Sequence, residues 1–444
     1  MLLARCWPRR RRPPLLALGL LALLASAAGP AAPLAAQQPT RDTTKTAAPP
    51  KKVTEQGEVV DTARITADTA ARLPGAGGEP PVEELSVDAG PQWRLSYFPY
   101  VTGGGGQGVM LAGRVRLWQP AEFADRVTSR GALSLDAGAN LESSRFASVR
   151  FDAPLLKRGW RATATLEANR QGRFGFYGLG NATVFDEALE NDAQPDFYRV
   201  ARTRYAARAE VTRRIRGPLH AALLVGVERA LFDALQEEGP TLFAGAVGAT
   251  ARETNGFARF ALVLDARNNE YNPTRGLLAE AGIETGSGGD GYHRGYASLT
   301  GYLPLAEATL VAARLAGSAM GGTPGLEERF TLPTWEDPLT VYGGIHTNRA
   351  YVAGRFLGRH TLFGNLEVRH DVFSIGDLGF VSVLGFVEAG RVFEDEGFRL
   401  TTHGLHAGYG GGLALRLLRS TVFTLNVAHG SDDWKVTAGS GWAF

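Results

Sequence analysis

Over most of the chain, apolar and polar residues alternate in runs of about ten residues. The clearest runs are residues 160–170, 199–213, 257–267, 277–285 and 360–371. In the last of these, Leu366 and Val368 alternate with Glu367 and Arg369. A period of two places alternate side chains on opposite faces of a strand, so each run predicts one strand. Strands of globular proteins average about 5–6 residues, whereas strands that span a membrane need about 9–11.

About sixteen such strands fit between residues 107 and 444, which leaves about 21 residues for each strand and its connection. An even number closes an antiparallel sheet into a barrel, and fourteen or eighteen strands would also do so. We therefore predict an all-β fold, a transmembrane antiparallel β-barrel with apolar side chains outside and charged side chains in the lumen. Periodicity alone does not separate this barrel from a soluble sandwich, in which the polar face meets water.

The N-terminus has the layout of a secretory signal peptide over residues 1–36. Arg5 and the run Arg9–Arg12 precede the short apolar segment Leu15–Leu24, and small residues follow up to Ala36. Cleavage is expected after Ala36 or after Ala27. A retained anchor is the alternative, but the apolar segment is too short to span a membrane comfortably. Cleavage would remove Cys6, the single cysteine, so disulfides and thiolate metal sites are not expected.

Residues 37–91 are rich in Thr, Ala, Pro, Glu and Gly and keep no period for long, so they predict a flexible low-complexity linker. The barrel is then assigned to residues 92–444. No later apolar run reaches the roughly 18 residues of a helical membrane span. Of 47 basic residues in 444, five lie in residues 1–36, which leaves 42 against 45 acidic residues. This balance gives no indication of nucleic-acid binding.

One turn between two predicted strands carries a motif of the form D-x-R-x-N…N-P-T-R-G. Its residues are Asp265, Arg267, Asn269, Pro273 and Gly276. Asn, Pro and Gly are typical turn residues. The motif resembles a turn of the bacterial surface antigen superfamily of outer-membrane barrels, which includes the BamA and TamA barrels and the two-partner secretion transporters.

Two further segments resemble the same superfamily. Arg349 and Tyr351 match its sixth-outer-loop motif R-G-[FY], and Phe386 and Glu388 match its F-x-[DE]-x-G strand. The resemblance implies that Arg349 holds the loop inside the lumen through Glu388, with Glu367 close by. An arginine forked onto a carboxylate is geometrically specific. The alternative is three unrelated solvated charges.

The loop motif departs from the superfamily at one position, where Ala350 replaces the usual glycine. Alanine tolerates a positive φ poorly, so either the loop has a negative φ here or it fits less tightly. The larger departure precedes the barrel. Superfamily members that handle clients carry POTRA modules, and residues 37–91 are too few and lack that pattern, so we expect a member without POTRA modules.

The last eleven residues alternate and end on an aromatic residue. The resemblance implies that Trp442 and Phe444 belong to a terminal strand that the barrel assembly machinery reads. A chance C-terminal Phe in a soluble strand is the alternative. A barrel of this type has the outer membrane as its location, with outer-membrane lipids, the assembly machinery and protein or lipid clients as partners.

The resemblance implies that the chain aids insertion or translocation of protein or lipid across or into the outer membrane. A structural or passive pore is the alternative, because a lumen lined by Arg and Glu conducts ions unless a loop blocks it. No set of residues has the spacing of a catalytic triad, so we expect no enzyme and no cofactor. His403 and His406 lack a third ligand at metal-site spacing, so no metal site is predicted.

Overall fold

The computed structural model describes residues 92–103, 109–122, 125–141, 143–237, 239–335, 339–340, 342–376, 379–417 and 421–444, with residues 52–53 and 59–60. The predicted signal peptide (1–36) lies outside the described residues. So does the predicted linker (37–91), except for the antiparallel pair β1 (Lys52–Val53) and β2 (Val59–Val60). The described residues from 92 to 444 belong to one unit, and residues 52–53 and 59–60 belong to a second.

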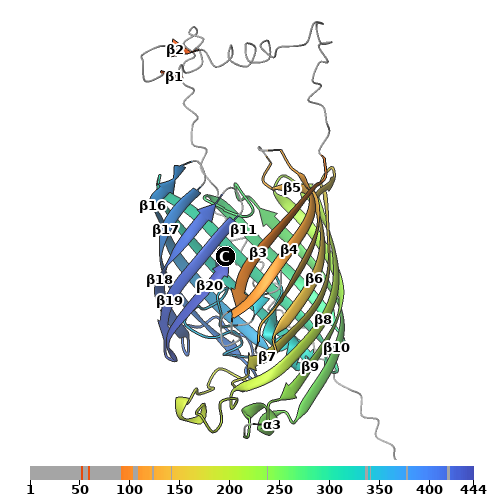
Figure 1. The fold of residues 1–444 in the computed structure, drawn as a ribbon. Helices are drawn as coiled ribbons and strands as arrows, with labels where there is room; N and C mark the ends of the chain where they lie inside the picture. Colours follow the sequence, from red (N-terminus) through yellow and green to blue (C-terminus); the bar gives the residue numbers. More distant parts are fainter. Residues whose placement is uncertain are drawn as a thin grey trace, which may run out of the picture. The chain divides into compact units, whose positions relative to one another are not determined.

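The larger unit is built on a sixteen-stranded antiparallel sheet. Its strands are β3 (Arg94–Gly103), β4 (Val109–Pro120), β5 (Ser129–Ala139), β6 (Arg145–Lys157), β7 (Trp160–Gly175), β8 (Arg199–Arg216), β9 (Leu219–Ala234), β10 (Thr250–Asp265), β11 (Gly276–Gly286), β12 (Gly291–Ala306), β13 (Thr309–Thr323), β16 (His360–Ile375), β17 (Gly379–Phe393), β18 (His406–Leu417), β19 (Thr421–Gly430) and β20 (Asp433–Ser440). Each strand pairs with the next one along the chain (Figure 1).

The ends of this sheet, β3 and β20, approach each other and bring the sheet round into a barrel (Figure 1). The predicted barrel with about sixteen strands is thus confirmed. The first strand begins at Arg94, earlier than residue 107, from which the alternation predicts strands. β3 carries Pro99, which has no N–H to give to a ladder and is confined to edge strands. Pro99 is tolerated because β3 is an end strand of the sheet. The proline also interrupts the residue pattern by which a strand is predicted.

The two faces of the sheet are apolar outside and polar inside, as predicted. On β16, Leu366 is 49% exposed on the outer surface, whereas Glu367 is 0% exposed in the lumen. The same holds on β10, where Phe260 and Leu262 are exposed and Arg259 is buried. This arrangement is the reverse of a soluble sandwich, because the buried interior holds the charges.

The longer connections alternate with shorter ones along the chain. Residues 176–198 carry η1 (Glu187–Leu189) and residues 235–249 carry α3 (Leu242–Ala246). The longest connection, residues 324–359, joins β13 to β16 and is called the inner loop below. It contains α4 (Leu326–Phe330) and the two-stranded sheet of β14 (Thr331–Leu332) and β15 (Leu339–Thr340). Among the described residues, no helix has the length and hydrophobicity needed to cross a membrane.

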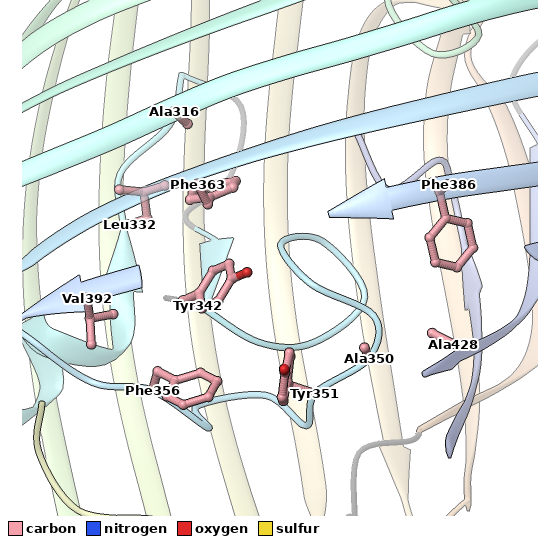
Figure 2. Packing of buried hydrophobic residues seen from close by; sticks show 10 residues of the cluster. All are labelled: Ala316, Leu332, Tyr342, Ala350, Tyr351, Phe356, Phe363, Phe386, Val392 and Ala428. Atoms are coloured by element: carbon pink, nitrogen blue, oxygen red, sulfur yellow. The ribbon is translucent and has the colours of Figure 1, made fainter. Parts of the chain in front are cut away.

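The inner loop lies inside the lumen. Its side chains pack against inward-facing residues of the barrel wall in a buried cluster (Figure 2). The cluster includes Tyr342, Tyr351 and Phe356 of the loop, with Phe363 and Phe386 of the wall. The inner loop is therefore part of the packed interior.

Candidate functional site

The tip of the inner loop is a tight turn that presents Arg349. Gly343 and Gly344 have φ of 123° and 95°, which a side chain would strain. The Gly344 N–H lies 3.0 Å from the carbonyl oxygen of Asn348 and 2.8 Å from that of Tyr351. The Asn348 side chain accepts the N–H of Ala350 at 3.1 Å. The turn is thus closed by its own backbone before it meets the barrel wall.

Arg349 binds two carboxylates of the wall. Its backbone N–H donates to Oε2 of Glu388 at 2.6 Å, and its Nε donates to Oε1 of the same group at 3.0 Å. Its Nη1 donates to Oε2 of Glu367 at 2.5 Å. The other oxygen of Glu367 accepts from Nε of Arg369 at 2.7 Å. We call Arg349, Glu367, Arg369 and Glu388 the arginine cluster.

The arginine cluster is buried and balanced in charge. Its side chains are between 0% and 3% exposed, with two guanidinium groups facing two carboxylates. The guanidinium carbon of Arg349 also lies 3.4 Å from the ring centre of Phe386. Removing one partner of such a pair leaves a buried charge uncompensated and costs about 3–5 kcal/mol. Loss of one member of the cluster is therefore expected to release the loop tip from the wall.

Strand register places the wall residues. Glu367 of β16 lies opposite Phe386 of β17, and Asn365 lies opposite Glu388. All four face the lumen because they are spaced by two along each strand. The Asn365 amide donates to Oε1 of Glu388 at 3.0 Å and to the Thr347 carbonyl oxygen at 2.7 Å. Asn365 was not among the predicted site residues, although its place two residues before Glu367 was the available signal.

Tyr351 ties the loop to the last strands. Its hydroxyl donates to the Ala407 carbonyl oxygen at 3.1 Å and lies 3.2 Å from Oγ of Ser431. Its ring packs edge-on against Phe356. Tyr342 adds a second tie, since its hydroxyl donates to the His406 carbonyl oxygen at 2.5 Å. Burial raises the pKa of Tyr342 well above its usual value, which keeps this hydroxyl protonated.

Ala350 fits tightly in the place where the superfamily motif has glycine. Positive φ among described non-glycine residues occurs only at Ser143 and Asp433, so Ala350 has the negative φ that was one of the two alternatives. Its side chain is fully buried. Room for it comes from Gly408, where an added Cβ would lie 2.5 Å from the Cβ of Ala350. The methyl group of Ala350 occupies the space that Gly408 leaves on the wall, so the alanine does not loosen the loop tip.

The turn motif makes its own set of contacts where β10 ends and β11 begins. Asp265 accepts from Nε of Arg267 at 3.0 Å, and Asn269 Oδ1 accepts the N–H of Tyr271 at 2.9 Å. Pro273 is buried, and Gly276 has a φ of 111°. An added Cβ on Gly276 would lie 2.3 Å from the Ala266 carbonyl oxygen, so glycine is required there.

The chain end differs from the predicted strand. β20 ends at Ser440, and Gly441, with a φ of 88°, turns the next residues into the lumen. The guanidinium carbon of Arg369 lies 3.9 Å from the ring centre of Trp442, and its Nη2 donates to the Phe444 carbonyl oxygen at 3.0 Å. The physical reason is that lumenal arginines offer cation–π contacts that hydrocarbon outside does not.

The contacts of Arg369 and Trp442 connect the inner loop, the chain end and the turn motif, which are far apart in the sequence. Arg369 belongs to the arginine cluster and also holds Trp442 and Phe444. Trp442 Nε1 donates in turn to Asn272 of the turn motif at 3.0 Å. The loop, the chain end and the turn are therefore linked through the lumen by one arginine.

The two histidines considered as metal ligands have other partners. The His406 ring stacks on Phe356 with 3.8 Å between ring centres, and its Nε2 lies 2.9 Å from the Asn181 carbonyl oxygen. At His403, the backbone N–H donates to Oγ1 of Thr401 at 3.0 Å, and the backbone carbonyl oxygen accepts from Nη1 of Arg391 at 2.7 Å. In the part of the chain that the structure describes, no group of three or more His, Cys, Asp and Glu residues is placed to hold a metal ion.

Comparisons with known proteins agree with this architecture. Residues 128–418 match the family model described as the Omp85 superfamily domain. The fold is similar to BamA from Haemophilus ducreyi lacking POTRA domains 1–3, with a TM-score of 0.50 and 12% identity over 79% of this chain and 70% of that one. It is also similar to CdiB from Escherichia coli, with a TM-score of 0.50 and 12% identity over 78% of this chain and 62% of that one. No match was found among curated proteins.

Proposed function

Since the chain belongs to the Omp85 superfamily, as an outer-membrane β-barrel of the BamA/TamA-like type, we propose that it inserts protein or lipid clients into the outer membrane or translocates them across it. The single observation that carries this proposal is the pairing of a fixed inner loop with an incompletely paired barrel seam. Insertion or translocation of a client requires exchange of hydrogen bonds between strands and no covalent chemistry.

The seam lies between the first and last strands. β3 pairs with β4 and β20 pairs with β19, and within the described residues no ladder joins β3 to β20. Unpaired N–H and C=O groups at a sheet edge form a template for another strand. In hydrocarbon each unpaired group costs several kcal/mol, so a client strand that pairs there is stabilised.

The arginine cluster supplies the opposite property. It fixes the inner loop to β16 and β17, on the part of the wall that leads to β20. Exchange of strands at the seam can then proceed while the lumen stays packed. A passive pore, the alternative, requires an open lumen, and the buried cluster of the inner loop supports a closed one.

We also propose the remaining assignments of the sequence. Residues 1–36 serve as a signal peptide, 37–91 as a linker, and 92–444 as the barrel. Trp442 and Phe444 are read by the assembly machinery before the barrel closes, because Phe444 contacts Arg369 in the lumen once the chain is folded. The turn motif Asp265, Arg267, Asn269, Pro273 and Gly276 has a structural role in the connection between β10 and β11.

Reconstitution tests the function directly. The full chain is placed in phospholipid vesicles, and folding of a urea-unfolded eight-stranded outer-membrane barrel is followed by its shift in electrophoretic mobility. We expect faster client folding than in empty vesicles, and a loss of that gain in Arg349→Ala. Arg416→Ala is the matched control, because Arg416 is a lumenal arginine that pairs with Asp371 and not with the inner loop. Equal rates with and without the chain, together with a large steady conductance in planar bilayers, would instead establish a pore.

A further inference from the structure

The outer surface of β17, β18 and β19 has a hollow of about 740 Å³. Its described lining includes Val387, Tyr409, Leu413, Val427 and Trp434, and none of the lining residues is charged. These side chains point outward, where Tyr409 and Trp434 are more than half exposed. Because the chain is an outer-membrane barrel, this surface faces lipid.

Two glycines directly opposite each other lie beside this hollow. Gly385 of β17 pairs with Gly411 of β18, and both lie on the outward face between larger side chains. A Cβ added to Gly385 would meet nothing within 4 Å, and one on Gly411 would meet only the Leu384 carbonyl oxygen at 3.1 Å. Glycine weakens the interior of a strand. The packing of the barrel does not explain why these two positions lack side chains.

Neighbouring glycines of β18 contrast with this pair. Gly410 and Gly412 face inward, and an added Cβ would lie 2.7 Å from the Phe386 ring or 2.6 Å from Oδ1 of Asn426. Interior packing therefore accounts for these inward glycines. Gly385 leaves open space instead, and Gly411, which lines the hollow, has one close backbone contact, so the absence of both side chains widens the hollow.

We propose that this hollow is a binding site for one acyl chain of a membrane lipid. Backbone groups of β17 and β18 beneath it are engaged in ladders on both sides, so the hollow offers no unpaired N–H or C=O to a client strand. An acyl chain needs no hydrogen bonds and fits an uncharged lining. The site adjoins the lipid-facing surface on every side, which gives the chain direct entry.

The top of the hollow is suited to the boundary between hydrocarbon and headgroups. Tyr409, His429 and Trp434 are register partners across the last three strands, with ring centres 5.7 and 4.9 Å apart. They lie next to the hairpin that joins β19 to β20. Tyrosine and tryptophan concentrate at membrane interfaces. A lipid with its headgroup at these rings would extend its chain toward Gly385 and Gly411.

Photolabelling tests this site in the full chain. The protein is reconstituted with phosphatidylethanolamine that carries a diazirine within one acyl chain, and the labelled peptides are mapped by mass spectrometry. We expect labelling on residues 379–427 to exceed that of other wall segments about threefold, because packing of a single chain inside a bilayer is worth little free energy. A second outward hollow, of about 430 Å³ and lined partly by Ala147, Ala168 and Ala207, provides an internal comparison.

Filling the hollow should remove the excess. Gly385→Leu is the first variant, and Gly411→Ala is the second if the first fails to fold as judged by heat-modifiable mobility. Gly301→Leu is the matched control, because Gly301 lies in β12 with nothing within 4 Å of an added Cβ and pairs with Ala313, not with another glycine. Uniform labelling around the barrel, an unchanged excess in the filled variants, or an equal loss in the control would overturn the proposal. So would recovery of a cross-linked polypeptide at the hollow in place of lipid.

Discussion

The wall formed by β16 and β17 and the seam between β3 and β20 belong to one sheet but differ in how completely their polar groups are hydrogen-bonded. On the wall, Glu388 accepts from the backbone and side chain of Arg349 and from Asn365. At the seam, within the described residues, the strand edges lack a mutual ladder. Polar groups whose hydrogen bonds are all made resist a change of partner, whereas strand edges with unpaired N–H and C=O groups can pair with a new strand. Under the proposed function, the barrel holds its inner loop at the wall and exchanges strands at the seam.

Closing the seam is expected to have the largest effect. Disulfides introduced between cysteines scanned along β3 and β20 should abolish client folding in vesicles and leave protease protection of the inner loop unchanged. The single native cysteine, Cys6, lies in the proposed signal peptide, whose cleavage would remove it. Addition of a reductant is the control and should restore activity. Full activity with the disulfides formed would show that strand exchange does not occur at the seam.

Breaking the wall should come next. Arg349→Ala leaves two buried carboxylates without their shared partner, at a cost of about 3–5 kcal/mol. Limited proteolysis should cut within residues 342–359 far faster than in the native chain. Arg416→Ala removes a lumenal ion pair without touching the inner loop and should leave those sites protected. Equal protection in both variants would mean that the aromatic packing alone holds the loop.

The inner loop also contains a buried carboxyl group that lacks hydrogen-bond partners. This group extends the comparison of paired and unpaired polar groups to a single segment. Glu328 of α4 is 2% exposed, and neither of its side-chain oxygens has a hydrogen-bond partner. Glu253, Glu228 and Glu327 lie near it, and Arg294 binds only its backbone carbonyl oxygen. Burial, with smaller contributions from these carboxylates, raises its pKa to about 7.

The sign of the pH effect follows from that shift. The folded state binds the Glu328 proton more tightly than the unfolded state, so its stabilising effect is present below about pH 4.5 and is lost as pH rises through about 7. The resulting change in the free energy of unfolding between low and high pH reaches about 3 kcal/mol. Glu328→Gln should remove most of the increase in protease cleavage near α4 between pH 5 and pH 8. Cleavage that rises equally in the variant would assign the pH effect to another group.

The sequence predicted the barrel well because alternation and strand length depend on local pattern. Arg349, Glu367 and Glu388 could be proposed from the resemblance, and the structure places them in contact. Asn365 was missed because its role depends on register with β17, which alternation does not specify. The inward turn at Gly441 was missed because an alternating end predicts a continued strand. Its partner Arg369 comes from a distant strand.

The smallest effect is expected where the wall meets the chain end. Arg369→Ala removes the ring contact with Trp442, the hydrogen bond to Phe444 and one of the two ion pairs of Glu367, and leaves Arg349 paired with both carboxylates. Because Glu367 keeps Arg349 as a partner, no buried carboxylate is left unpaired, and we expect a smaller cost than the cost of about 3–5 kcal/mol for Arg349→Ala. Tryptophan fluorescence should shift as Trp442 loses its contacts, whereas loop protection should change little. Arg369→Lys is the control, because it keeps the charge and loses the planar stacking. If Arg369→Ala exposed the loop as fully as Arg349→Ala, the chain end would be part of what fixes the loop, and the wall and the seam would be coupled through the terminal residues after β20.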